Sequence, residues 1–571
     1  MKLIFKYLRP LWRSVTWGLI IKILATLFEL TLPYILSHIL DTVVPLGELL
    51  PIIKWGGVMI AAAVLAMVGN IIANRNAAKV AKSAARAIRH DLFAATMHLS
   101  SRETDGFTVP SLESRLTSDT YHIHHFIGMM QRMAVRVPIL LLGGIAITML
   151  LDWRLAIVLS ITMPLIGVAI FSVTRKGLPL YTETQRAVDG MVRVVREDCQ
   201  GVRVIKALSK EDYESRRYDT VNRRLVSCER RAGITMALSQ PLVTLLLNLG
   251  LVAVLLVGAY LVEGGLSMPG RIIAFLQYFT LMSTAMTAMS RIFVMSTKSV
   301  ASANRIAEVL ASSERQSAPT PVDGDEKKAF LQFLNVTFSY NGKKNNLQNI
   351  SFSLPRGGTL GIIGATGSGK TTLVSLLQRF YTADSGSIKI GGEDIYTLPE
   401  KELRARFGIV MQNDFLYADT VRENIRFGRD LSDAEIERAA ALAQAADFIE
   451  NFTDGYDHVL TPKGTNLSGG QRQRVLIARA LAGHPEILIL DDASSALDYK
   501  TDAALRRALR EEVKTTTVIV AQRVSSVKHA DHILVLDHGK IIGAGTHEEL
   551  LVACPAYREI SNSQMGGAFL E

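Results

Sequence analysis

Long runs of apolar residues without a charged side chain constrain this sequence more than any other feature. Such runs occupy residues 55–74, 155–174, 232–262 and 272–290. Because a helix needs about 20 apolar residues to cross the bilayer core, each run predicts a membrane span. Residues 17–40 are a weaker candidate because they contain Lys22 and Glu29, and residues 137–151 form a short one. The sequence therefore predicts six spans.

The charges lie mainly outside these spans. The chain has 63 basic and 53 acidic residues, a formal net charge of +10, yet only 20% of its residues are charged. Basic residues outnumber acidic ones at the amino terminus and in residues 75–136 and 175–231. By the positive-inside rule, the amino terminus and both long loops are expected in the cytosol, with the chain in the cytoplasmic membrane. This explains the basic charge without a nucleic-acid partner and excludes a purely soluble enzyme.

The composition changes after residue 310. Residues 311–328 are rich in serine, proline and charge and predict a linker. Residues 329–571 alternate short apolar or β-branched runs with amphipathic stretches, which indicates an α/β fold with a mainly parallel sheet. The expected order is a transmembrane domain at 1–310, the linker, and a soluble domain at 329–571.

A phosphate-binding pattern opens the soluble domain. Residues 364–371 read Gly-Ala-Thr-Gly-Ser-Gly-Lys-Thr and match G-x-x-x-x-G-K-[ST], between an apolar run and a helical stretch. Backbone N–H groups of such a loop and the following helix dipole attract phosphate oxygens. Lys370 would add a point charge, and Thr371 would ligate Mg²⁺. The predicted phosphate-binding residues are Gly364, Ala365, Thr366, Gly367, Ser368, Gly369, Lys370, Thr371 and Thr372.

A second pattern supplies carboxylates. Residues 487–492, Ile-Leu-Ile-Leu-Asp-Asp, are four apolar residues followed by two acids. In a P-loop fold, a buried strand of this kind delivers the acid that helps to hold the metal. Asp491 is therefore predicted at the Mg²⁺ site.

Residues 467–471, Leu-Ser-Gly-Gly-Gln, are more specific. Here the chain resembles the ATP-binding cassette (ABC) transporters, whose signature sequence this is. The resemblance covers nearly the whole chain and implies a half-transporter of the exporter type: six transmembrane helices followed by an α/β P-loop nucleotide-binding domain. It implies ATP and Mg²⁺ as cofactors, the lipid bilayer as surroundings, and a second half-transporter as partner.

The resemblance also implies individual roles. Ser468 and Gly470 would contact the γ-phosphate held by the opposite subunit, and Tyr340 would stack on adenine. Gln412 would ligate Mg²⁺ and sense the membrane domain. The remaining implied nucleotide-site residues are Leu467, Gly469 and Gln471 of the signature and Asp498 of the D-loop at 494–498. Residues 114–119 and 202–207 resemble the first and second coupling segments.

Three positions depart from the family pattern. The general base is a glutamate in the family, whereas this chain has Asp492, whose side chain reaches roughly 1–1.5 Å less far toward a proton that a base must approach within about 2.6–3.2 Å. The switch histidine is replaced by Gln522, which can bind phosphate but carries no charge. The acidic X-loop position is Pro462. The two altered catalytic positions predict a degenerate site in one half of an asymmetric heterodimer.

Several membrane residues are candidates for substrate contact. Met282, Met286 and Met289 recur at helical spacing one turn after Gln277, which fits either a drug-binding wall or helix packing. Glu29 is costly to bury in a membrane and is the better pathway candidate.

The predicted function is ATP-driven export of amphiphilic small molecules, drug-like or lipid-like, by a heterodimer in which this chain's signature completes the partner's catalytic site. Its own site would hydrolyse ATP weakly. Three alternatives stay open from the residues: a homodimeric lipid or drug exporter, an importer on the exporter fold, and a regulatory subunit that gates without pumping.

Overall fold

The computed structural model describes residues 1–312, 329–412, 414–493, 496–513 and 515–565. It divides into two compact units. The first, the membrane unit, comprises Met1–Leu99 and Phe107–Ser313, and the second, the nucleotide unit, comprises Ser100–Gly106 and Glu314–Glu571. The predicted linker at 311–328 lies almost entirely outside the described residues.

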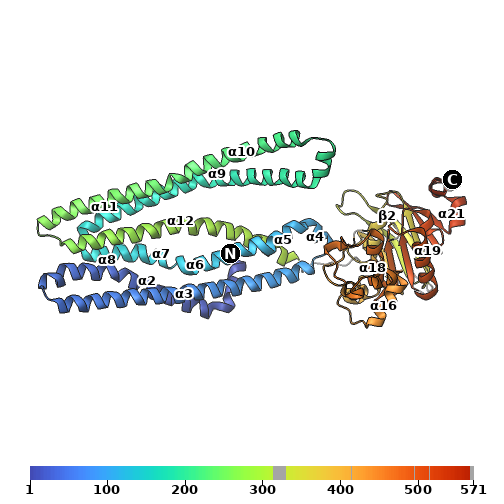
Figure 1. The fold of residues 1–571 in the computed structure, drawn as a ribbon, viewed down its shortest axis with the longest axis horizontal. Helices are drawn as coiled ribbons and strands as arrows, with labels where there is room; N and C mark the ends of the chain where they lie inside the picture. Colours follow the sequence, from blue (N-terminus) through green and yellow to red (C-terminus); the bar gives the residue numbers. More distant parts are fainter. Residues whose placement is uncertain (313–328, 413, 494–495, 514, 566–571) are drawn as a thin grey trace. The chain divides into compact units, whose positions relative to one another are not determined.

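The membrane unit is built of helices (Figure 1). Six stretches of the described chain are long and apolar enough to cross a bilayer: Lys2–Leu46, Leu49–Met97, Val109–Leu151, Trp153–Ala207, Glu211–Glu263 and Pro269–Met289. Each contains one of the six predicted spans. The helices are α1 (Lys2–Leu8), α2 (Trp12–His38), α3 (Leu49–Met97), α5 (Val109–Ser114), α6 (Thr120–Met133), α7 (Arg136–Pro138), α8 (Gly144–Leu151), α9 (Trp153–Ala207), α10 (Glu211–Ala237), α11 (Ser239–Glu263) and α12 (Pro269–Ser312). The short helix α4 (Ser101–Phe107) belongs to the nucleotide unit except for its last residue.

Small residues let these helices approach one another closely. A β-carbon at Gly69 of α3 would lie 2.9 Å from that of Ala25 in α2, and one at Gly250 of α11 would lie 2.3 Å from the Phe279 ring of α12. Helices in lipid associate through such close van der Waals contacts because the hydrophobic effect does not drive them together there. Met282 is fully buried in this packing and Met286 partly, whereas Met289 is exposed. The methionine spacing therefore reflects helix packing at Met282.

The first cytosolic loop corrects one expectation. Residues 114–119 resemble a coupling segment, but Ser100–Gly106 is the part of this loop that belongs to the nucleotide unit. There Asp105 accepts a hydrogen bond of 2.6 Å from the Tyr381 hydroxyl. Residues 115–119 instead pack on α12: Asp119 is 2% exposed and accepts hydrogen bonds from Ser302 (2.9 Å) and Arg305 Nε (2.8 Å). The polar residue Asp119 of this segment therefore forms an ion pair with Arg305 inside the membrane unit.

The nucleotide unit contains two sheets. A four-stranded antiparallel sheet has the order β2-β1-β4-β5, and a six-stranded sheet has the order β10-β9-β3-β8-β7-β6 among the described residues. Within the second sheet β9, β3, β8, β7 and β6 run parallel, and β10 pairs antiparallel with β9. The strands are β1 (Leu331–Phe338), β2 (Leu347–Leu354), β3 (Thr359–Gly364), β4 (Ser385–Ile390), β5 (Glu393–Asp394), β6 (Phe407–Val410), β7 (Ile487–Asp491), β8 (Thr516–Val520), β9 (His532–Asp537) and β10 (Lys540–Gly545).

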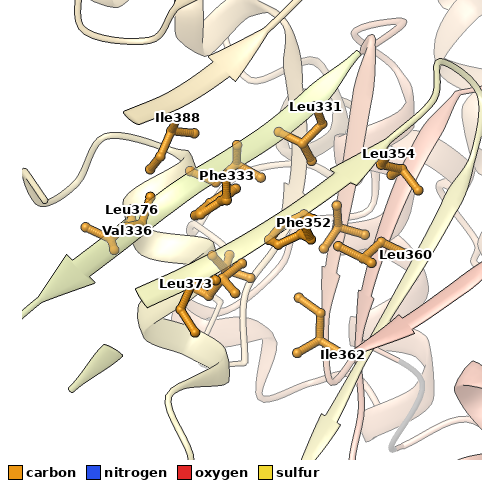
Figure 2. Close-up of a cluster of buried hydrophobic side chains, with 14 of the residues drawn as sticks. Leu331, Phe333, Val336, Phe352, Leu354, Leu360, Ile362, Leu373, Leu376 and Ile388 are labelled. Atoms are coloured by element: carbon orange, nitrogen blue, oxygen red, sulfur yellow. The ribbon is translucent and has the colours of Figure 1, made fainter. Parts of the chain in front are cut away.

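Helices complete this unit. They are α13 (Lys370–Leu377), α14 (Glu400–Ala405), α15 (Val421–Arg426), α16 (Asp433–Leu442), α17 (Ala446–Glu450), α18 (Gly469–Leu481), α19 (Tyr499–Ala508), α20 (Val524–Val527), α21 (His547–Ala553) and α22 (Pro555–Met565). Figure 2 shows how the core joins the two sheets: Phe333 and Phe352 stack at 4.7 Å beside Leu373 of α13 and Ile362 of β3. This apolar cluster fixes the strand and helix that flank the phosphate-binding loop.

The buried ion pair on α12 leads to a stability prediction. Asp119→Ala should destabilise the membrane unit by about 1–3 kcal/mol because it leaves the buried Ser302 hydroxyl without its acceptor and Arg305 without its counter-charge. The apparent melting temperature of the purified protein, followed by size-exclusion chromatography after heating, should fall by several degrees.

Asp219→Ala is the matched control, because Asp219 pairs with Arg223 on the surface of α10 and such pairs contribute little. Equal losses for the two variants would contradict a stabilising role for the buried pair.

Candidate functional site

The site lies at the carboxyl edge of the six-stranded sheet. Because neighbouring strands run parallel, the segments that follow them emerge on the same side. The phosphate-binding loop follows β3, Gln412 follows β6, Asp492 follows β7, and Gln522 follows β8. Asp491, the last residue of β7, pairs with Val520, the last of β8. Four sequence motifs thus meet through strand pairing alone.

The phosphate-binding loop requires its glycines. A β-carbon at Gly364 would lie 2.1 Å from the Leu536 carbonyl oxygen, so no side chain fits there. Gly369 has a φ of +105°, and a β-carbon would press on Leu347 at 2.7 Å. Lys370 opens α13 and donates hydrogen bonds of 2.8 Å to the carbonyl oxygens of Gly364 and Ala365. The loop therefore closes around an ammonium group that can turn to phosphate oxygens.

The buried polar groups of the loop fit a triphosphate with its metal. Ser368 is 3% exposed and its hydroxyl has no hydrogen-bond partner among the described residues. The Thr371 hydroxyl donates to the Asp491 carboxylate, which pairs two oxygen groups of the kind that Mg²⁺ binds. Burial raises the pKa of Asp491 and lowers that of Lys370, and each charge partly offsets the effect on the other. A bound cation would favour the charged carboxylate.

Asp492 stands in an unusual conformation. Its φ is +54°, in the left-handed region that Asp and Asn adopt more readily than Glu. Its amide N–H donates to the Val520 carbonyl at 2.9 Å, and its carbonyl accepts from Gln473 Nε2 at 3.1 Å. Burial raises the pKa of its carboxyl, whereas Arg523 and Lys370 lower it. The carboxylate is thus half-buried at the site on a fixed backbone.

Gln522 is held from the carboxyl-terminal helix. Gln564 of α22 donates from Nε2 to the Gln522 carbonyl at 2.9 Å and accepts from the Val524 N–H at 2.7 Å. The Gln522 side chain itself is exposed.

These groups surround one cleft of about 240 Å³. The predicted residues that line it are Thr366, Gly367, Gly369, Lys370, Thr371, Thr372, Gln412, Asp491, Asp492 and Gln522. Asn346, Val520 and Ala521 complete the lining. The cleft therefore combines a phosphate cradle, two carboxylates and three side-chain amides.

Tyr340 lies beside the cleft. Its hydroxyl donates to Thr372 Oγ1 at 3.2 Å, and its ring meets the edges of Phe338 and Tyr381 at 4.9 and 5.0 Å. The Tyr340 N–H donates to Asn346 Oδ1 at 3.1 Å. An aromatic ring fixed next to α13 fits the predicted stacking on a base.

The signature does not line this cleft. Ser468 caps α18, where its hydroxyl accepts from the Gln471 N–H at 3.3 Å and its own N–H donates to Gln471 Oε1 at 2.9 Å. Since the hydroxyl only accepts here, its proton stays available to a ligand.

The other signature residues pack beneath and beside this helix start. Leu467 is buried below it, and Gly469 and Gly470 lie against Ala496. A β-carbon at Gly470 would lie 3.1 Å from the Ala496 carbonyl oxygen, so a larger residue there would press on the backbone.

Asp498 caps another helix. Its two carboxylate oxygens accept from the Thr501 N–H (2.9 Å) and hydroxyl (2.8 Å) at the start of α19, and these bonds lower its pKa. Ser494 and Ser495 of the predicted D-loop lie outside the described residues.

Sequence reasoning missed Asn346, Gln473, Arg523 and Gln564. Asn346 follows Tyr340 by six residues in the same turn, but its approach to the loop depends on β2 lying beside β1. Gln473 and Gln564 act on backbone groups of other segments, which no local pattern reveals.

Comparisons with known proteins agree with this arrangement. Residues 15–286 match the family model of the ABC transporter transmembrane region, and residues 347–495 match a second family model, ABC transporter. An uncharacterized ABC transporter ATP-binding protein of Mycobacterium tuberculosis is 35% identical over 574 residues, which cover 98% of each chain. The uncharacterized ABC transporter ATP-binding protein YfiB of Bacillus subtilis is 34% identical over 562 residues, also 98% of each.

A solved structure shows the same fold. The structure of a bacterial Atm1-family ABC exporter with ATP bound superposes with a TM-score of 0.82 at 25% identity and covers 97% of this chain and 99% of that one. With a transmembrane region, a P-loop ATP-binding domain and full-length relatives of the same kind, the chain belongs to the ABC transporters and has the architecture of an exporter half-transporter.

Proposed function

We propose that the chain is one half of a heterodimeric ABC exporter that moves amphiphilic small molecules across the cytoplasmic membrane, with the nucleotide unit in the cytosol. In this proposal it binds ATP and Mg²⁺ in a site that hydrolyses slowly, and it completes the productive site of its partner. The observation that carries the proposal is the pairing of Asp492 and Gln522 at one cleft whose binding residues are otherwise intact.

The binding residues have separate tasks. Lys370 would exchange its two carbonyl partners for phosphate oxygens, and the Ser368 hydroxyl would gain the acceptor it lacks. Thr371, Asp491 and Gln412 would hold Mg²⁺, which neutralises charge on the phosphates. Tyr340 would stack on the base. These interactions require neither Asp492 nor Gln522.

The chemical step needs more than binding. A general base must reach the attacking water, and Asp492 is one methylene shorter than the glutamate expected there. Gln522 supplies an amide in place of an imidazole that can carry charge. Slow turnover at this site follows from both changes.

The signature requires a second chain. Ser468 and Gly470 lie outside the cleft of their own chain, yet Ser468 presents a hydroxyl proton at a helix amino terminus, where anions bind favourably. ABC exporters act as dimers in the membrane, so these residues would face the phosphates held by the partner.

The chain alone should bind ATP but turn it over slowly. Asp492→Glu combined with Gln522→His should raise the turnover of the purified chain in lipid by about 10²-fold, because a placed base typically contributes 10²–10⁴-fold. The left-handed φ of residue 492 disfavours glutamate and limits the gain. Steady-state ATPase provides the measurement, with Lys370→Ala as the variant that loses binding.

The result that contradicts this prediction is wild-type turnover equal to that of the double variant and abolished by Asp492→Asn. The chain would then work as a homodimer on its own aspartate.

When this chain is co-expressed with its partner, mutations that affect the two nucleotide sites should lower ATPase activity unequally. Ser468→Ala removes a donor from the productive site, where each donor is worth about 2.7–4 kcal/mol, so ATPase should fall by roughly a hundredfold or more. Asp492→Ala affects the slow site and should change turnover little.

Ser432→Ala is the matched control for Ser468→Ala. Ser432 forms the same capping box with Glu435 at the start of α16, so its loss reports the cost of the cap alone. Equal losses from Ser468→Ala and Asp492→Ala would show that both sites are catalytic.

A further inference from the structure

A stripe of polar residues runs along α2 inside the membrane unit. Lys22, Thr26 and Glu29 recur at helical spacing within the candidate span Lys2–Leu46. Lys22 is only 4% exposed, and its Nζ donates to Asn70 Oδ1 at 2.5 Å and to Asn74 Oδ1 at 3.5 Å on α3. These partners are neutral, so hydrogen bonds hold the ammonium group but leave its charge uncompensated.

The neighbouring charges do not balance it. Glu29 forms an ion pair of 2.6 Å with Arg136. Lys22 interacts electrostatically with Glu29, Arg132 and Arg136, and Glu29 is the one acid among these described groups. Three basic side chains and one carboxylate thus lie near this part of α2. Lys22 and Glu29 belong to the predicted span at 17–40, whereas Arg132 and Arg136 close the basic segment 75–136 just before the predicted span at 137–151. Ionisable groups at such positions face a partner or a cavity and mark functional sites.

Two buried polar atoms of this cluster, Glu29 Oε2 and Arg136 Nε, have no partner among the described residues. A buried polar group without a hydrogen bond costs about 1–3 kcal/mol. The cluster therefore has both excess positive charge and unused hydrogen-bonding capacity.

An apolar groove of about 550 Å³ adjoins the cluster at Glu29. Leu32 and Pro33 of α2 and Leu276 and Leu281 of α12 line it, with Gln277 among them. Its volume lies within the range of pockets that hold one drug-sized ligand. Glu29 is already paired with Arg136, so the groove leads to a region of net positive charge.

We propose that this cluster and groove form the substrate site and that the substrate is an amphiphilic anion. The acidic head group would lie at Lys22, Arg132 and Arg136, and the apolar tail would occupy the groove between α2 and α12. This inference rests on the proposed transport function and names its substrate class. An acidic head group supplies the missing counter-charge, whereas a cationic amphiphile would add a fourth positive charge to the cluster.

Direct binding tests the proposal without ATP. The full chain, with its partner, is placed in phosphatidylcholine nanodiscs and titrated with dansylated undecanoic acid and with its alcohol and trimethylammonium analogues. The acid should bind about tenfold or more tightly than either analogue. Equal affinity for the three probes, or tighter binding of the cation, overturns the proposal.

Variants at Lys22 separate charge from structure. Lys22→Gln keeps a hydrogen-bond donor but removes the charge, so affinity for the acid should fall about tenfold, the loss expected for one charge-assisted hydrogen bond, while the alcohol is unaffected. Lys22→Arg should restore binding, and Lys176→Gln, on the exposed side of α9, is the matched control. An equal loss for acid and alcohol contradicts the proposal. Arg132→Gln provides the same test if Lys22→Gln does not fold.

Two further readouts keep the hypotheses apart. Competition with phosphatidylglycerol, itself an amphiphilic anion, distinguishes the source of the head group: displacement of the acid assigns the site to an anionic lipid, and no displacement assigns it to a soluble amphiphilic anion. The effects of Ser468→Ala and Asp492→Ala on ATPase activity are measured in the same preparation. If the two variants differ but the three probes bind equally, only the substrate-site inference is contradicted. If the acid binds more tightly but the two variants lose ATPase activity equally, only the degenerate-site proposal is contradicted.

Discussion

Parallel pairing of β3, β8, β7 and β6 is the constraint on which the nucleotide site depends. Each strand is buried and contributes one short segment at its carboxyl end, so residues separated by more than a hundred positions share one cleft. The core between the two sheets holds β3 and α13 in place, and therefore also the phosphate-binding loop that connects them. A shift in this pairing would separate Lys370 from Asp491, the two charges proposed to bind phosphate and metal.

The same constraint explains why the two altered residues lie in one cleft. Asp492 and Gln522 follow adjacent strands, and the Asp492 N–H donates to the carbonyl of Val520, the last residue of β8. The Gln522 backbone is held in turn by Gln564 of α22. Both changes therefore fall on the side of the cleft formed by the ends of β7 and β8, whereas Lys370 and Thr371 begin α13 after the neighbouring strand β3.

The sequence predicts much of this arrangement because a motif that directly follows a parallel strand must lie at the carboxyl edge of the sheet. Six apolar runs are sufficient to identify six spans, and Gly364 and Lys370 are recognisable from their spacing. Contacts made across long distances in the chain leave no such pattern. Residues 114–119 resemble a coupling segment in sequence, but the partners of Asp119, Ser302 and Arg305, lie on α12, where only the fold places them.

In the membrane unit, too, the sequence does not reveal the partners of two charged residues, Lys22 and Glu29. Hydropathy alone treats Lys22 and Glu29 as flaws in the first span, since each charge lowers the average of its run. Once α2 lies against α3, α6 and α7, Glu29 is paired with Arg136 and Lys22 is held by neutral amides. A charge that is hydrogen-bonded but not neutralised costs less than a bare one, yet still attracts a counter-charge. Inside a bilayer that counter-charge must come from another protein group or from a ligand, and the proposed acidic head group is a ligand that could supply it.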